Sequence, residues 1–266
     1  MGKGKAYEQK SIDYYSYISD LGNWNAVYKV IFSMGGLITV IGADSLWISL
    51  VTILFMLFLS VGVGRIPMKA YLRLMKIPAA FLLMGGAAIM VQIGRGHNSI
   101  FYISFFQTKL YITKDSLLLA VNVTLKALAA VSAFYMLTLS TPMGEIISVF
   151  RRLHVPALIL ELMHLIYRYI FILSETNQKQ KDAAKSRLGY CDLKTSFHTF
   201  SSEMANLLVL SMKKADMYYD AMESRGYEGT GIFWEETKTV TGKQLMYGAL
   251  YTLLLMLVFI VLRRNV

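Results

Sequence analysis

Two short segments, each built around an arginine, have the composition of helix ends that could bind a partner protein. The first reads SRLGY at residues 186–190, and the second reads SRGY at residues 224–227. A glycine just after a helix commonly adopts the left-handed conformation that closes the last turn, and an arginine there is favoured by the negative end of the helix dipole. One such segment alone is typical of an ordinary helix end. The same arrangement at two long helices predicts two equivalent contacts.

The chemistry predicted for these contacts is the recognition of carboxylate or carbonyl groups. Arginine holds its hydrogen-bond donors in a rigid fork that matches such acceptors in a partner. We therefore expect each segment to dock on one of two equivalent partner subunits, through the residues Ser186, Arg187 and Leu188 and the residues Ser224, Arg225 and Gly226.

The chain lacks the glycine-rich pattern of a nucleotide-binding loop. Its nearest segment, TGKQ from Thr241, has neither the leading glycine nor the final Ser or Thr of the G-x-x-x-x-G-K-[ST] pattern. If ATP drives this protein, another subunit must bind and hydrolyse it. We expect no cofactor in this chain.

Glu161, His164 and Arg168 form a competing candidate site. The Glu-x-x-His spacing places the first two side chains on one helix face, as in di-iron bundles, and Arg168 follows one turn later. Such a centre needs a second Glu-x-x-His and two further glutamates, which the apolar segments do not supply. No histidine pair has the spacing of metal ligands, so we expect no metal site. A membrane enzyme that uses these three residues remains an alternative function.

The composition indicates a polytopic membrane protein. Hydrophobic residues make up 55% of the 266 residues and charged residues only 17%, whereas soluble domains are about a quarter charged. The net charge of +10 is explained by basic cytoplasmic loops, since positive charge resists translocation. We therefore expect no nucleic-acid partner.

The apolar runs predict an all-α fold with about five transmembrane helices. Each is close to the 17–25 residues that cross a bilayer core, and they cover about residues 27–43, 46–64, 79–93, 116–139 and 245–262. The basic segment 65–78 is predicted to be a short interfacial helix. Placing it and the N-terminus in the cytoplasm makes the topology self-consistent for a protein of the cell membrane. Lys126, inside a span, should face protein or an interface.

Residues 141–244 are predicted to form a cytoplasmic region of long helices between an N-terminal membrane region, 1–140, and a C-terminal span, 245–266. A helix that starts at Pro156 can run to Arg187, which is about 48 Å at 1.5 Å per residue. It is longer than a bilayer core needs, and only its first half is apolar. We therefore expect this helix to lie along the membrane boundary or to emerge from it rather than to span it simply, with a sixth span as the alternative.

The helix after Gly189 carries an apolar stripe at spacings of three and four residues. This face could pack against the helix that starts at Pro156, or it could pass motion to a membrane partner. Its members are Met204, Leu208, Met212, Ala215, Tyr219 and Met222.

The whole chain resembles the transmembrane T component of energy-coupling factor transporters, of the CbiQ type. The resemblance rests on the order of the spans, on SIDYYSYISDLGNWNAVYK near the N-terminus, and on ELMHLIYRYIFIL, KSRLGY and AMESRGYEG. It implies a scaffold that links two ATPase subunits to a substrate-binding membrane subunit of the CbiM or S-component type, with a small accessory membrane subunit as an optional partner. ATP would be bound by the ATPases.

In that family each coupling helix ends in a short arginine motif, usually Ala-Arg-Gly, that docks into a groove of one ATPase. Both segments of this chain have serine in place of the alanine. The first also has Leu188 where glycine is usual, which puts the equivalence of the two contacts in question.

The resemblance implies uptake of cobalt or nickel, although selectivity belongs to another subunit. Three alternatives stay open: service to a vitamin-type substrate subunit, the membrane enzyme described above, and a receptor-like or structural membrane protein without transport coupling.

Overall fold

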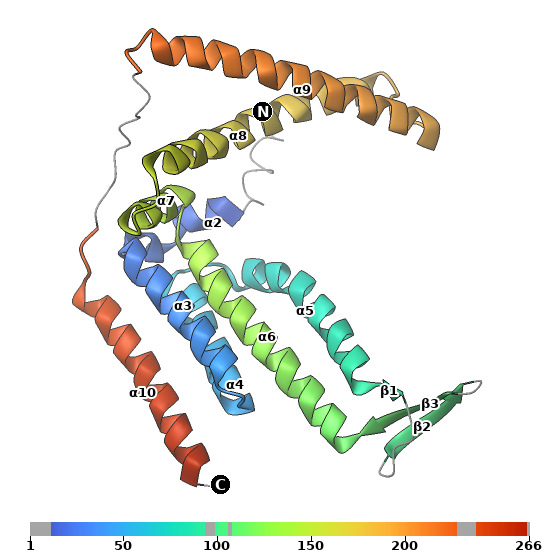
Figure 1. Ribbon diagram of the computed structural model, residues 1–266, viewed down its shortest axis with the longest axis vertical. Coiled ribbons are helices and arrows are strands. Elements are labelled where there is room, and N and C mark those ends of the chain that lie inside the picture. The colour runs from blue at the N-terminus through green and yellow to red at the C-terminus, as the bar shows by residue number, and fades with distance from the viewer. Residues whose placement is uncertain (1–11, 94–98, 106–107, 228–237, 265–266) are drawn as a thin grey trace. The chain divides into compact units, whose positions relative to one another are not determined.

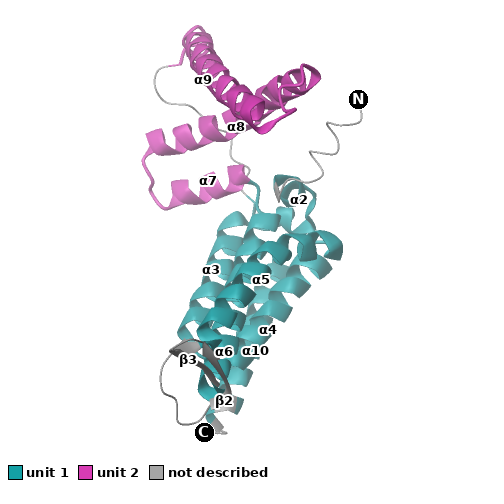
Figure 2. Cartoon of the chain, turned by 90° about the vertical axis from the view of Figure 1, so that its right-hand side faces the viewer, with its two compact units in different colours: residues 1–142, 237–266 teal, residues 143–236 magenta. Residues whose placement is uncertain are grey.

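The computed structural model describes residues 12–93, 99–105, 108–227 and 238–264, and the chain divides into two compact units. Unit 1 comprises residues 1–142 and 237–266, and unit 2 comprises residues 143–236 (Figure 2). The C-terminal helix therefore belongs to the same unit as the N-terminal helices. The N-terminal lysines lie outside the described residues.

Unit 1 is a bundle of apolar helices (Figure 1). Its helical elements are α2 (Ile12–Ile18), the 3-10 helix η1 (Asp20–Asn23), α3 (Ala26–Gly42), α4 (Leu46–Leu57), the π-helical turn η2 (Phe58–Val63), α5 (Met68–Met90), α6 (Lys114–Ser140) and α10 (Gly242–Arg264).

Unit 2 consists of α7 (Met143–Arg152), α8 (Ala157–Ser186) and α9 (Leu193–Glu223). Across the described part of the chain, five helical segments are long and apolar enough to cross a membrane: α4 with η2, α5, α6, α8 and α10. A sixth apolar helix, α3, has 17 residues. The predicted helical, polytopic fold is confirmed. Helix α8, which was expected at the membrane boundary, is among the five that are long and apolar enough to cross.

Helix α5 corrects one prediction. The interfacial helix over 65–78 and the span over 79–93 are one continuous helix, Met68–Met90, with Pro78 inside it. Proline lacks an N–H and leaves the carbonyl four residues earlier without its helical donor. That carbonyl, on Leu74, accepts a hydrogen bond from the Tyr135 hydroxyl of α6 at 3.2 Å. A neighbouring helix thus satisfies the group that proline frees, and the helix continues.

The connection between α5 and α6 contains a small sheet, which the all-α prediction did not include. It contains β1 (Gln92–Ile93), β2 (Ser99–Phe105) and β3 (Thr108–Thr113), which form an antiparallel sheet in the order β1-β3-β2. Tyr102 lies opposite Tyr111 in the register. Ile, Phe, Tyr and Thr are frequent in these strands, and such residues favour extended backbone.

Small and polar residues let the helices of unit 1 approach closely. A side chain at Gly86 would collide with Thr124 of α6, which is the close approach that the glycines of this span predict. The Ser33 hydroxyl of α3 donates to the Ala133 carbonyl at 2.7 Å. The buried ammonium of Lys29 donates to the Ser140 carbonyl at the end of α6, at 2.9 Å.

Lys126 lies where the sequence predicts, against protein. Its ammonium nitrogen is 2.5 Å from a carboxylate oxygen of Asp44, in the turn between α3 and α4, and its side chain is only 24% exposed. The pairing neutralises a charge that would otherwise be expensive within a span.

The C-terminal helix is held to unit 1 by aromatic side chains and by hydrogen bonds. Tyr251 of α10 contacts the rings of Phe32 and Phe55, with centroids 5.3 Å and 5.0 Å away. The Tyr28 hydroxyl donates to the Gln244 carbonyl at 2.6 Å. These contacts join the last helix to α3 and α4, near the other end of the chain.

Candidate functional site

The candidate site is built on α8 and α9, which form a helical hairpin inside unit 2. Asp192 starts α9, because its side chain accepts a hydrogen bond from the Thr195 N–H at 2.8 Å. Further along, the rings of Tyr169 and Tyr218 lie 5.2 Å apart. The guanidinium carbon of Arg168 lies 6.0 Å from the centre of the Tyr218 ring, within the range of a cation–π contact.

Helix α8 ends in a double hydrogen-bonded turn around Arg187. The Leu188 N–H donates to the Lys185 carbonyl at 3.2 Å, and the Gly189 N–H donates to the Ala184 carbonyl at 2.9 Å. The residue in the left-handed conformation is Leu188, with φ of 55°. This is the Schellman pattern that satisfies the last carbonyls of a helix.

Helix α9 ends in the same pattern around Arg225. The Gly226 N–H donates to the Glu223 carbonyl at 2.9 Å, and the Tyr227 N–H donates to the Met222 carbonyl at 3.1 Å. Gly226 takes the left-handed conformation, with φ of 80°. Arginine therefore precedes the left-handed residue at both ends.

The two segments thus share one backbone geometry, although their glycines have different roles. Gly226 is left-handed, as predicted, but the same prediction for Gly189 is wrong because Leu188 occupies that position. Gly189 is needed for space instead: a Cβ atom there would lie 3.0 Å from the Ala184 carbonyl oxygen and from Thr199. The departure at Leu188 leaves the shape of the turn unchanged.

Both arginine side chains are exposed. Within the described ranges, neither guanidinium makes a hydrogen bond or an ion pair. The neighbouring serines bond back into their own helices: the Ser186 hydroxyl donates to the Asp182 carbonyl, and the Ser224 hydroxyl donates to the Ala221 carbonyl. Arg187 and Arg225 are therefore free to bind acceptors on another molecule.

A tyrosine after the first arginine ties the helix end to the opposite helix. The Tyr190 hydroxyl donates to a carboxylate oxygen of Glu203 at 2.7 Å. Glu203 is the one residue of α9 that is buried, at 6% exposure. The hydrogen bond to this carboxylate is the main cause that raises the pKa of Tyr190.

The second helix end has an analogous tie to α8. The Tyr227 hydroxyl lies close to the carboxylate of Glu161, and its interaction with this carboxylate is the main cause that raises the pKa of Tyr227. Glu161 is also buried, at 6% exposure. We call these two pairs, Tyr190–Glu203 and Tyr227–Glu161, the tyrosine ties. Sequence reasoning missed them, and the only signal was a tyrosine shortly after each arginine.

The competing candidate site, Glu161, His164 and Arg168, is occupied by contacts within unit 2. Glu161 holds Tyr227, and Arg168 lies over Tyr218. His164 also has an interaction partner. In the described part of the chain, no group of three or more His, Cys, Asp or Glu side chains is arranged to hold a metal ion.

The predicted apolar stripe of α9 is only partly covered. Met212 and Ala215 line a small cavity with Tyr169 and Leu173 of α8. Met204 and Met222 are half-buried. Leu208 and Tyr219 are more than half exposed, and Met212 is also more than half exposed although it lines the cavity. The stripe therefore offers a surface beyond its contact with α8.

Known proteins are similar to this chain over most of its length. Residues 20–238 match the family model CbiQ, described as a cobalt transport protein. An uncharacterized protein of Methanocaldococcus jannaschii is 27% identical over 92% of this chain and 91% of its own length.

Two further relatives have names that describe transport. The cobalt transport protein CbiQ of Salmonella typhimurium is 27% identical over 64% of this chain and 76% of its own length. A putative fused cobalt transport protein CbiMQ of Methanocorpusculum labreanum is 28% identical over 88% of this chain, which spans 39% of that longer protein.

Proposed function

Because the chain belongs to the CbiQ family of cobalt transport proteins, we propose that it is the energy-coupling membrane subunit of an ATP-driven importer. It is a multi-pass membrane protein of a transport family. In the proposal, unit 1 lies in the cell membrane with the N-terminus in the cytoplasm, and α8 and α9 carry motion from two ATPase subunits. ATP is bound and hydrolysed by those subunits.

The observation that carries the proposal is the hydrogen-bonded turn that the two arginine ends share. Arg187 and Arg225 each precede a left-handed residue, and both guanidiniums are without a partner in the described part of the chain. A guanidinium fixed by a closed turn is suited to bind carbonyl or carboxylate groups in a groove. Two copies of one geometry fit two copies, or two homologues, of one partner.

The tyrosine ties support a mechanical role. A load applied at Arg225 is carried by Tyr227 to Glu161 near the start of α8, and a load at Arg187 is carried by Tyr190 to Glu203 on α9. Each helix end is thereby braced on the other helix. The hairpin would move as one lever when the ATPases close.

A substrate-binding membrane subunit is the second proposed partner, and a relative in which CbiM and CbiQ are fused supports it. The exposed apolar side chains of unit 2 are a suitable contact surface. On α8 they include Leu162, Ile166 and Ile170, and on α9 they include Leu208 and Tyr219. The proposed substrate is cobalt, with nickel and then a vitamin as alternatives that uptake measurements distinguish.

The family gives no support to the alternative of a membrane enzyme, because its members are described as transport proteins. The receptor or structural alternative predicts that no ATPase copurifies with the chain from mild detergent.

The test is a charge reversal at each arginine in cells that carry the whole transport system. Arg187→Glu and Arg225→Glu should each weaken ATPase copurification and reduce cobalt uptake by at least about tenfold, as expected for loss of a charge-assisted contact. Membrane insertion should be unaffected because both side chains are exposed.

Lys194→Glu and Lys213→Glu are matched controls, since both lysines are exposed on α9 and neither belongs to an arginine segment. They should leave copurification and uptake near the wild-type level. Wild-type assembly and uptake in both arginine variants would overturn the proposal.

A further inference from the structure

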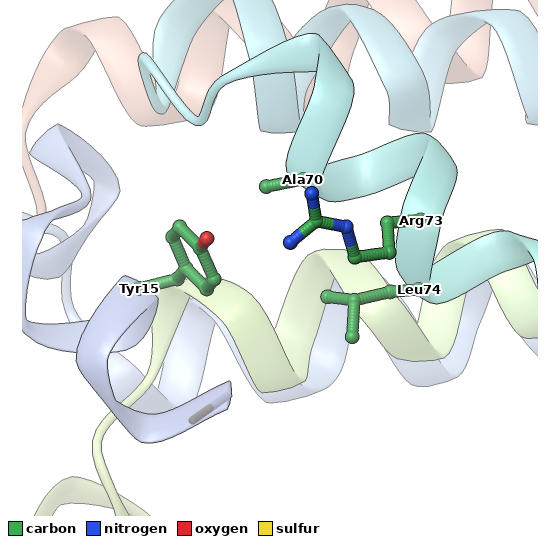
Figure 3. Close-up of a pocket in the computed structure, with 4 residues that line it drawn as sticks. All are labelled: Tyr15, Ala70, Arg73 and Leu74. Carbon is green, nitrogen blue, oxygen red and sulfur yellow. The ribbon is translucent and has the colours of Figure 1, made fainter. Parts of the chain in front are cut away.

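A cavity in unit 1 has the features of a site for an acidic lipid. It has a volume of about 440 Å³, lies between α2 and the first half of α5, and is lined by Tyr15, Ala70, Arg73 and Leu74. Figure 3 shows the Arg73 guanidinium extending toward the Tyr15 ring, past Ala70. We call it the Arg73 pocket.

The pocket carries positive charge that the described residues do not neutralise. Arg73 makes no ion pair within the described ranges, and neither do Lys69 and Lys76, which lie one turn before and after it on α5. Nearby Arg65 differs, because its guanidinium is 3.1 Å from the Asp20 carboxylate. The free charge therefore gathers on α5, and it is suited to a phosphate group.

An apolar track continues from Arg73 along the same helix. Ile77, Phe81 and Met84 follow Arg73 at spacings of four, four and three residues, which places all four on one side of α5. These three side chains are 80%, 70% and 69% exposed. The track from Arg73 to Met84 is roughly 16 Å long at the helical rise, close to half of the ~30 Å thickness of a bilayer core.

A cation in a cavity at the head of an exposed apolar track matches an amphiphile better than a soluble anion or a protein. Basic pockets between membrane helices bind acidic headgroups, and the track supplies a surface for an acyl chain. An apolar helix of a membrane partner could use the track, but it would not supply the phosphate that suits the unpaired cations at the head of the track. We propose that the Arg73 pocket binds the phosphate of an anionic phospholipid, whose acyl chain lies along Ile77, Phe81 and Met84.

The test is native mass spectrometry of the full-length protein in detergent, titrated with palmitoyl-oleoyl phosphatidylglycerol. Arg73→Gln should lower lipid affinity by about tenfold more than Lys69→Gln does, because only Arg73 lines the cavity and can pair directly with phosphate. Lys69→Gln is the matched control, with the same charge change one turn away, and should lose only the diffuse attraction of about fivefold or less. Phosphatidylcholine should bind more weakly than phosphatidylglycerol.

Two further measurements separate the sources of the phosphate. Glycerol phosphate and inorganic phosphate at millimolar concentration should not displace the lipid, because they lack the acyl chain. Phe81→Ser should weaken lipid binding severalfold, while Leu118→Ser, an exposed apolar position on α6, should not.

Three results would overturn the assignment. One is an equal loss of lipid affinity in Arg73→Gln and Lys69→Gln. Another is equal affinity for phosphatidylcholine and phosphatidylglycerol. The last is displacement by inorganic phosphate, which would assign the pocket to a free anion. None of these bears on ATPase docking, so the two proposals can fail separately.

Discussion

At the scale of single residues, the arginine segments show that equal shape does not require equal sequence. Leu188 adopts the left-handed conformation that Gly226 adopts at the second segment. This conformation costs an L-residue with a side chain about 1–2 kcal/mol. The chain accepts this cost at an exposed position that a glycine could fill, and Leu188 is 73% exposed. The leucine side chain is therefore available to a partner.

Replacing this leucine with glycine should relieve the backbone strain. We expect Leu188→Gly to stabilise unit 2 by about 0.5–1 kcal/mol, because the conformational gain exceeds the entropy that glycine loses on folding. Thermal unfolding in detergent measures the change. The reciprocal Gly226→Leu should destabilise by a similar amount, and a Leu188→Gly protein that melts lower than wild type would contradict this account.

The tyrosine ties lead to a second prediction at this scale. Tyr227→Phe removes the hydroxyl that interacts with the Glu161 carboxylate but keeps the ring. Hydrogen exchange at residues 222–227 should quicken about fivefold, as for loss of one hydrogen bond, while exchange at residues 184–190 stays unchanged. Tyr190→Phe should have the converse pattern.

The pH dependence of this effect has a definite sign. The pKa of Tyr227 is raised above its ordinary value of 10.0, so the tie contributes fully below pH 10 and is lost as pH rises through the raised pKa. The difference between wild type and Tyr227→Phe should therefore be constant between about pH 6 and pH 9. A difference that disappears within this range would rule out the neutral phenol as the donor.

Sequence reasoning found the arginines but not what holds them. The repeated segment was visible because its residues are close in sequence. Glu161 and Glu203 were not, since Tyr227 meets Glu161 across the hairpin of α8 and α9, and Tyr190 folds back from the connection onto Glu203 of α9. In the sequence, Glu161 stands out only as part of a Glu-x-x-His spacing typical of metal ligands. The contacts in the folded chain do not support that role. A left-handed residue at a helix end does not by itself mark a docking segment. Helix α7 also ends in one, His154, and the residue directly before it is Leu153.

At the scale of elements, α5 shows how the bundle tolerates a proline inside a membrane helix. The Tyr135 hydroxyl replaces the missing donor at the Leu74 carbonyl. Removal of this hydroxyl leaves a carbonyl unsatisfied in an apolar setting, at a cost of about 1–3 kcal/mol. We therefore expect Tyr135→Phe to lower stability by that amount, measured by thermal unfolding in detergent.

A double-mutant cycle makes this prediction specific. Pro78→Ala restores an N–H that can bond the Leu74 carbonyl, so the cost of Tyr135→Phe should fall to near zero in the Pro78→Ala background. An equal cost in both backgrounds would show that Tyr135 stabilises the bundle in some other way.

Most elements follow from the length and polarity of the segments. The apolar runs place α3, α4, α6 and α10 within a few residues of their observed bounds. The division of α5 was wrong because proline and a run of charges suggest a helix boundary, while the rescue by Tyr135 comes from another helix. The strands β2 and β3 were not predicted. Their segment connects two spans, and its sequence pattern is weaker than the long apolar runs of the spans themselves.

At the scale of the molecule, the chain separates into a unit that can reside in lipid and a unit that presents two arginines. Unit 1 is centred on α6 and includes α10, whose aromatic residues pack on α3 and α4. Unit 2 has a thin core of its own, with large apolar faces exposed on α8 and α9. Such faces commonly mark interaction surfaces, in keeping with the partners that we propose for unit 2.

The central claim is that Arg187 and Arg225 each hold one ATPase subunit. The most direct measurement is native mass spectrometry of the purified transport complex without nucleotide, which counts the ATPases bound to one copy of this chain. The account predicts two for the wild type, one for Arg187→Glu or Arg225→Glu alone, and none for the double variant. Two ATPases retained by the double variant would contradict it.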